Sequence, residues 1–293
     1  MQMYILAGPL AMLIRPIYET VQNYGWTLVI VTVLINLLTI PLTIMSQKSM
    51  SKTQQIQPLI NELQKKYAND REKLNVEMQK IYTKYGINPM AGCLPMIVRL
   101  FIILGFVGVV YNPLQYILQM STEQINAIKS TIEAAGERIT YQVQLCGRPE
   151  TIEAIQSLGK QPINFNFMGI DLTKMLSANK TDIVVWIIPV MAVLATVLSS
   201  LLSKKLMANN ANGQAAGGST MLLMMPVMTA YFTYIMPIGM SLYWFTSTIV
   251  NMLQQVISNL VIKKNQKELP LTLNDKKRLE SAKSKNSNPA NKK

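Results

Sequence analysis

The sequence contains no histidine, and its only two cysteines, Cys93 and Cys146, fall in different regions of the chain. It therefore offers no histidine base, no disulfide framework and no cysteine pair with metal-ligand spacing. A glycine-rich phosphate loop followed by Lys and Ser or Thr is also missing. We expect no catalytic residue, no metal and no cofactor, so the chain is not predicted to be an enzyme. Cys93 is expected to be a small packing residue.

Charge is also scarce, because Asp, Glu, Lys and Arg make up 15% of the chain and hydrophobic residues 49%. Apolar runs of about 20 residues recur, which is the length that crosses a hydrocarbon core of about 30 Å. None of these runs contains Asp or Glu. This weakens proton-coupled or ion-coupled transport, which usually places carboxylates in the spans. The sequence predicts an all-α polytopic membrane protein.

Five transmembrane helices are predicted. They cover residues 23–47, 91–111, 183–203, 220–236 and 240–262. Pro41 is expected to kink the first span near its far end. Only Pro237, Ile238 and Gly239 separate the last two spans. So short a turn makes these two spans an antiparallel pair.

Two amphipathic segments flank the first span. Residues 1–22 are predicted to form an N-terminal interfacial amphipathic helix, because apolar residues recur at helical spacing beside Arg15 and Glu19. A short uncleaved anchor is the alternative. Residues 48–90 are predicted to form a helical hairpin that breaks at residues 68–70. Its apolar stripes suit either a solvated cap or a docking surface.

The remaining segments differ in charge. The 112–182 loop is near neutral and is predicted to hold helices at 122–139 and 151–158, the second ended by Gly159. The hairpin, the 204–219 linker and the 263–293 tail are basic and carry most of the net charge of +13. If five spans alternate, these basic segments share one side. The positive-inside rule then predicts an extracytoplasmic loop, an N-terminus outside and a cytoplasmic C-terminus.

One polar residue lies deep in each of the first two spans: Asn36 and Arg99. An arginine within an apolar span costs at least a few kcal/mol, so it indicates either a functional site or a side chain that snorkels to the interface. No acid lies in any span, so its partner is expected to be water, backbone, a headgroup or an arriving group. Asn36 is either a packing hydrogen bond between helices or part of the wall of a polar cavity.

The last two spans carry further polar side chains. These are Thr233, Ser241, Thr246, Ser247, Asn251 and Gln254, with Tyr243 and Trp244 near the outer end. The three- and four-residue spacing of Ser247, Asn251 and Gln254 places them on one helix face. Each could make an ordinary packing hydrogen bond. Together with Arg99 they predict a hydrated groove, which lowers the cost of moving a hydrophilic segment into the membrane.

Several stretches resemble the YidC membrane-insertase family in its five-span form without a large extracytoplasmic domain. They are Asn23-Tyr24-Gly25 leading to Ile40-Pro41-Leu42, Gln57-Pro58, residues 84–95 (KYGINPMAGCLP), residues 169–172 (GIDL), Met225-Pro226, and residues 236–244 (MPIGMSLYW) continuing to Asn251. The resemblance covers residues 15–262. The order and spacing of the pieces are specific, whereas no single piece is.

The resemblance implies insertion of small or single-span proteins into the bacterial plasma membrane, alone or beside the Sec translocon. The implied partners are nascent membrane proteins, membrane lipids and the ribosome, whose RNA phosphates would bind the basic tail in a salt-sensitive way. We assign the substrate groove to Arg99, Asn36, Thr233, Ser247, Asn251, Gln254 and Trp244. Substrate recruitment is assigned to Gln57, Pro58, Leu59, Leu63 and Tyr82, and ribosome contact to Lys263, Lys264, Lys276, Lys277 and Arg278.

The sequence departs from the family pattern at two positions. Asn36 stands where the family usually has arginine, and Arg99 stands where it usually has glutamine. We hypothesise that the positive charge of the groove has moved from the first span to the second. The 112–182 loop is longer than the short form of the family requires. A membrane-protein assembly chaperone or scaffold without insertase activity, and a small-substrate transporter, remain alternatives.

Overall fold

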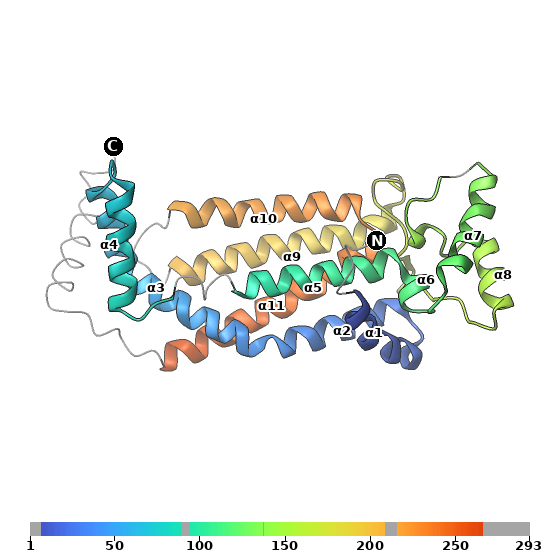
Figure 1. Ribbon diagram of the computed structural model, residues 1–293, viewed down its shortest axis with the longest axis horizontal. Helices are drawn as coiled ribbons and strands as arrows, with labels where there is room; N and C mark the ends of the chain where they lie inside the picture. Colours follow the sequence, from blue (N-terminus) through green and yellow to red (C-terminus); the bar gives the residue numbers. More distant parts are fainter. Residues whose placement is uncertain (1–6, 89–93, 137, 209–215, 266–293) are drawn as a thin grey trace. The chain divides into compact units, whose positions relative to one another are not determined.

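A computed structural model describes residues 7–88, 94–136, 138–208 and 216–265 (Figure 1). The chain divides into two compact units. The first comprises Met1–Leu38, Ile97–Ser200 and Leu223–Met252, and the second comprises Thr39–Met96, Leu201–Leu222 and Leu253–Lys293. The described residues are mostly helical, as the sequence predicted.

The described residues contain seven long helices, of which the last four follow predicted apolar stretches closely. They are α1 (Ala7–Val21), α2 (Tyr24–Leu38), α3 (Ile40–Lys66), α5 (Leu94–Tyr111), α9 (Ile183–Ala208), α10 (Ala216–Ile235) and α11 (Ile238–Asn265). Within the first unit α1 packs beside α2. A single apolar core includes Leu28 of α2, Phe106 of α5, Ile188 of α9 and Met240 of α11. Burial of these side chains holds the helices of this unit together.

The first predicted span differs from the observed helices. The helical run is interrupted at Thr39, and Pro41 lies in the first turn of α3, where its missing N–H costs no hydrogen bond. Beyond this point α3 continues without a break to Lys66, past the expected boundary at residues 47 and 48. No glycine or proline occurs between Leu42 and Gln57, so nothing local ends the helix there.

The outer faces of the long helices are apolar. The exposed large side chains of α9 are Ile183, Val184, Trp186, Ile187, Val190, Met191, Leu194, Val197, Leu198 and Leu201. In α11 the exposed residues include Leu253, Ile257 and Leu260, whereas Ser241 and Thr246 are buried. Water-soluble proteins rarely expose apolar faces this large. Apolar side chains outside and polar ones inside suit a hydrocarbon environment.

Few of these helices are both long enough and apolar enough to cross a membrane alone. Among the described residues, Ile183–Leu206 passes both criteria alone, and α2 with the first part of α3 passes only if the interrupted pair counts as one span. The Met96–Tyr111 part of α5 is apolar but shorter. The polar residues of α11 lower its hydropathy. The number of five spans therefore stays a prediction.

The segment between α5 and α9 folds into a small cap. It contains α6 (Pro113–Tyr116), α7 (Thr122–Ala134), a 3-10 turn (Gln142–Gln144), α8 (Pro149–Ser157) and the antiparallel strands β1 (Asn166–Phe167) and β2 (Ile170–Asp171). Helix α7 ends earlier than predicted because Gly136, with a φ of +91°, terminates it. The predicted stop after α8 at Gly159, also with a positive φ, is confirmed. The strand pair was not predicted.

Backbone hydrogen bonds join the cap to the first residues of two long helices. The Tyr24 N–H donates to the Asn164 carbonyl at 2.9 Å, at the start of α2. The Ile238 N–H donates to the Lys174 carbonyl at 2.9 Å, and the Gly239 N–H donates to the Leu172 carbonyl at 3.0 Å. Residues 164–174 thus tie the start of α2 to the start of α11.

The second unit contains α3 and α4 (Arg71–Lys84). Asp70 caps α4 by accepting a hydrogen bond from the Lys73 N–H at 3.0 Å. The two helices share an apolar cluster of Ile56, Leu59, Ile60, Tyr85 and Ile87, against which Met78, Ile81 and Tyr82 pack. The arrangement is compatible with a helical hairpin, whose cytoplasmic position stays a prediction.

Candidate functional site

Arg99 lies in the second turn of α5 and is half-buried. Its Nη2 donates a hydrogen bond to Oδ1 of Asn251, which α11 contributes, and the two atoms are 2.5 Å apart. Within the described residues Asn251 is the hydrogen-bond partner of the guanidinium. Arg99 therefore has a partner within the protein. A side chain that snorkels to the interface would need no such partner.

A row of polar side chains continues from Asn251 along α11. The Asn251 Nδ2 donates to the Ser247 hydroxyl at 3.2 Å. Tyr243, Ser247 and Asn251 are four residues apart, so they stack on one face of the helix. Asn251 lies at the Arg99 end of this face, and its bonds join Arg99, Asn251 and Ser247 into one polar network between α5 and α11.

This network leaves the arginine charge unneutralised. A guanidinium has five N–H donors in a planar fork that matches a carboxylate with two parallel hydrogen bonds. Asn251 is neutral and uses one of these donors. The other donors are suited to water or to an acidic group that arrives from elsewhere. A guanidinium with free donors is suited to recognition of an anion.

Three further predicted groove residues make contacts of their own. The Asn36 Nδ2 donates to the Thr32 carbonyl in its own helix at 2.7 Å. The Thr233 hydroxyl donates to the Ala230 carbonyl at 3.1 Å. Trp244 stacks on Phe232, with ring centroids 5.5 Å apart. Of the predicted set, the structure brings together Arg99, Asn251 and Ser247.

Gln254 is buried and belongs to the second unit. Its neighbour Gln255 makes a contact that the sequence did not indicate, because its amide and the Ser203 hydroxyl are hydrogen-bonded at 3.0 Å. This bond links α9 to α11 within the second unit. The two residues are 52 positions apart, and local spacing gives no sign of such a pair.

The predicted recruitment residues are only partly accessible. Leu59 is 3% exposed in the α3 and α4 cluster, so it stabilises the pair and does not offer a contact surface. Gln57, Pro58, Leu63 and Tyr82 are half-buried, and the Gln57 amide donates to Asn61 Oδ1 at 3.1 Å.

Some predicted residues lie outside the described residues. They are Cys93 and the tail residues Lys276, Lys277 and Arg278. Lys263 and Lys264 belong to the last turn of α11. Among the described residues no group of three or more Cys, Asp or Glu side chains is placed to hold a metal ion.

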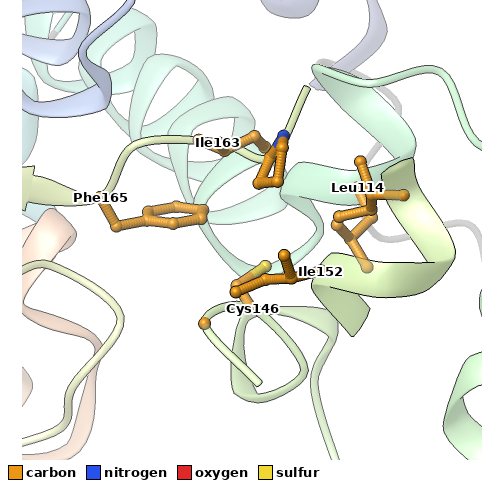
Figure 2. A pocket seen from close by; sticks show the side chains of 8 residues that line it. Leu114, Cys146, Ile152, Ile163 and Phe165 are labelled. Atoms are coloured by element: carbon orange, nitrogen blue, oxygen red, sulfur yellow. The ribbon is translucent and has the colours of Figure 1, made fainter. Parts of the chain in front are cut away.

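A small cavity of about 40 Å³ lies inside the cap, away from Arg99. Figure 2 shows Leu114, Ile152, Ile163 and Phe165 around it, with Cys146 at its wall. The Cys146 thiol is buried and its sulfur is 3.6 Å from the Gln142 carbonyl oxygen. Burial, and to a smaller extent the nearby Asp171 carboxylate, raise the pKa of this thiol above its ordinary value. The cavity is a gap in apolar packing.

The raised pKa predicts that Cys146 reacts slowly while the cap is folded. The thiolate is the reactive form, and a higher pKa lowers its fraction at every pH below that pKa. In a Cys93→Ala chain, maleimide labelling at about pH 8 should be at least ~100-fold slower than in denaturant, because both burial and the pKa oppose it. Labelling is followed by intact mass. Equal rates in buffer and in denaturant would show that the thiol is accessible in the folded cap.

Comparison with known proteins assigns the chain a family model. Residues 16–266 match the model described as 60Kd inner membrane protein. The chain is 27% identical over 246 residues to the membrane protein insertase YidC of Fusobacterium nucleatum, covering 84% of this chain and 91% of that protein.

Two other relatives are matched over less of their length. The chloroplastic inner membrane protein PPF-1 of Pisum sativum is 28% identical over 238 residues, which are 80% of this chain and 48% of that protein. The membrane protein insertase YidC of Nitratidesulfovibrio vulgaris is 38% identical over 110 residues, which are 38% of this chain and 21% of that protein. The chain thus spans less than half of these two relatives.

Proposed function

The chain belongs to the 60Kd inner membrane protein family, which includes the YidC insertases, and from this we propose that it inserts proteins into the bacterial inner membrane. Its substrates would be small or single-span membrane proteins. The apolar outer faces of α9 and α11 support a position within the bilayer. The proposed topology has five spans, with the N-terminus outside and the C-terminus in the cytoplasm, because the basic segments then share the cytoplasmic side.

One observation carries the proposal: the unneutralised Arg99, in the apolar helix α5, is held by polar side chains of α11. A charge kept there at a cost of at least a few kcal/mol requires a function. We assign it the binding of an acidic or strongly polar residue in the hydrophilic flank of the substrate. Such a flank would then avoid direct contact with hydrocarbon.

The proposed mechanism has three steps. The α3 and α4 pair meets the nascent hydrophobic segment, and the hydrophilic flank enters a groove near Arg99 that is open to the cytoplasm. The hydrophobic segment then moves past the first, fourth and fifth spans into lipid. Substrate hydrophobicity drives this movement, and the membrane potential assists acidic flanks. The basic tail would contact ribosomes, and the Sec translocon would assist with some substrates.

The hypothesis of a relocated charge is part of this proposal. Arg99 would supply the cation that the family usually places at the position of Asn36. The bond from Arg99 to Asn251 supports a role for Arg99 inside the unit. Asn36, whose amide also donates to the Thr32 carbonyl, would supply an amide to the same groove.

Insertion by the purified protein tests the proposal. Vesicles of phosphatidylethanolamine and phosphatidylglycerol that contain the full chain should insert a single-span client severalfold more efficiently than empty vesicles, without nucleotide. The measurement is the client fragment protected from added protease. Vesicles with an unrelated polytopic protein are the control. Client binding without a rise in the protected fragment would contradict insertion and favour an assembly scaffold.

A further inference from the structure

The hairpin of β1 and β2 carries an apolar residue at its tip. Met168 and Gly169 form its two-residue loop, between the paired residues Phe167 and Ile170. Their φ angles are +52° and +86°, the signs that a type I′ turn needs. Met168 is 79% exposed, more than almost all other large apolar side chains in the described residues.

Turn chemistry does not explain a methionine at this position. The left-handed region disfavours side chains other than those of Gly, Asn and Asp, and hairpin loops of this type favour Asn-Gly. Exposure to water adds a second cost, because Met is an apolar residue. A strained and exposed apolar residue at a fixed position indicates a contact. The residues around Met168 indicate which partner it contacts.

The base of the hairpin is fixed to the start of α2. The Phe167 side chain lies against the backbone of Gly25, where a Cβ atom would come within 2.3 Å of the ring. The rings of Trp26 and Phe167 meet edge to face with centroids 5.3 Å apart. The Asn23 Nδ2 donates to the Asn166 carbonyl at 2.8 Å. The tip therefore has a fixed position beside the first turn of α2.

Helix α2 presents an apolar stripe that begins at this place. Trp26, Ile30, Leu34 and Leu37 are all exposed, and their spacing of four, four and three residues places them on one face. A tryptophan at the end of an exposed apolar stripe is typical of a side chain at the membrane interface. Met168 directly follows Phe167, whose ring contacts Trp26 at this end of the stripe.

We infer that Met168 and Trp26 form a lipid contact, with Met168 inserted into the leaflet on the side of the cap. The occupant is lipid because the stripe that it continues faces outward and is apolar along its whole length. The contact would fix the depth at which α2 enters the bilayer. It does not depend on insertase activity, so its failure would leave the proposed function untouched.

Photocrosslinking of the wild-type chain tests the inference directly. The probe is a phospholipid with a diazirine near the glycerol end of its acyl chain, in vesicles that hold the full chain. We expect the tryptic peptide 161–174 to be labelled at Met168, while peptide 139–160, which contains α8, is not. No label on 161–174, or equal labelling of both peptides, would overturn the inference.

A second measurement uses one label at each of two matched positions. In a Cys93→Ala chain, a nitroxide is attached to Met168→Cys or to Ser157→Cys, an exposed site at the end of α8. The label at position 168 should collide more with oxygen and less with an aqueous nickel chelate than the label at 157. A chain with Cys146 as its only cysteine gives the background labelling. If Cys146 stays unreactive, the cap is folded. Equal collision rates at the two positions would contradict lipid contact.

Discussion

Replacing Arg99 with alanine is expected to reduce insertion of a client with an acidic flank by about tenfold or more, since tenfold corresponds to only about 1.4 kcal/mol in the barrier. The reason is that the substitution removes the one cation that the polar row on α11 holds inside the unit. A client whose flank has no acidic residue should lose less. The measurement is the protease-protected client fragment at matched protein levels.

Three further variants test whether insertion depends on the positive charge itself or on the helix that carries it. Arg99→Gln removes the charge and keeps hydrogen-bond donors, so it should lose the same preference for acidic flanks. Asn36→Arg combined with Arg99→Gln restores a charge in α2, and recovery of insertion would support a relocated charge. Asn251→Asp places a permanent carboxylate beside the guanidinium and should compete with the substrate.

The matched control for these variants is Leu194→Ala. Leu194 is 62% exposed on α9, so the change shortens a side chain on the outer face without touching the polar network. It should insert clients as well as wild type. If Arg99→Ala also inserts them as well as wild type, the arginine has no role in insertion. The α3 and α4 pair and the general polarity of α11 would then be better places to look.

Gly25→Ala is expected to destabilise the first unit by about 1–3 kcal/mol, the usual cost of forcing extra atoms into a packed site. A Cβ at this position would lie 2.3 Å from Cδ2 and 2.6 Å from Cβ of Phe167. The close approach includes the root of the phenylalanine, so a rotation of its ring does not relieve it. The backbone at the start of α2 or the β hairpin must move. Thermal unfolding in detergent and the labelling rate of Cys146 both measure this loss of stability.

A double-mutant cycle and a second glycine make this prediction specific. Phe167→Ala should cost stability by itself, but Gly25→Ala added to it should be nearly neutral, because the clashing atoms are gone. Gly8→Ala is the control, since a Cβ there meets nothing within 4 Å and alanine favours a helix. A Gly25→Ala chain as stable as the Gly8→Ala chain would contradict the close packing of Phe167.

The sequence by itself determined the positions of most helices and identified Arg99 as an unusual residue. Apolar runs gave the positions of α5, α9, α10 and α11 to within a few residues, and Gly159 gave the end of α8, because such signals depend on neighbours along the chain. Arg99 was conspicuous for the same reason: a charge within an apolar run needs no structure to be noticed. The family motifs also lie in order along the chain.

The tertiary structure alone decided which side chains meet. Asn251 is 152 residues from Arg99, and the sequence marked both as polar without pairing them. The shared groove of Asn36 and Arg99 stays a prediction, and Leu59, assigned to substrate recruitment, is buried. The contact of Phe167 with Gly25 and the exposed Met168 depend on a hairpin with two-residue strands, too short to leave a periodic pattern. The physical reason is that helix rotation and packing register set these contacts, and periodicity fixes a face without fixing its neighbour.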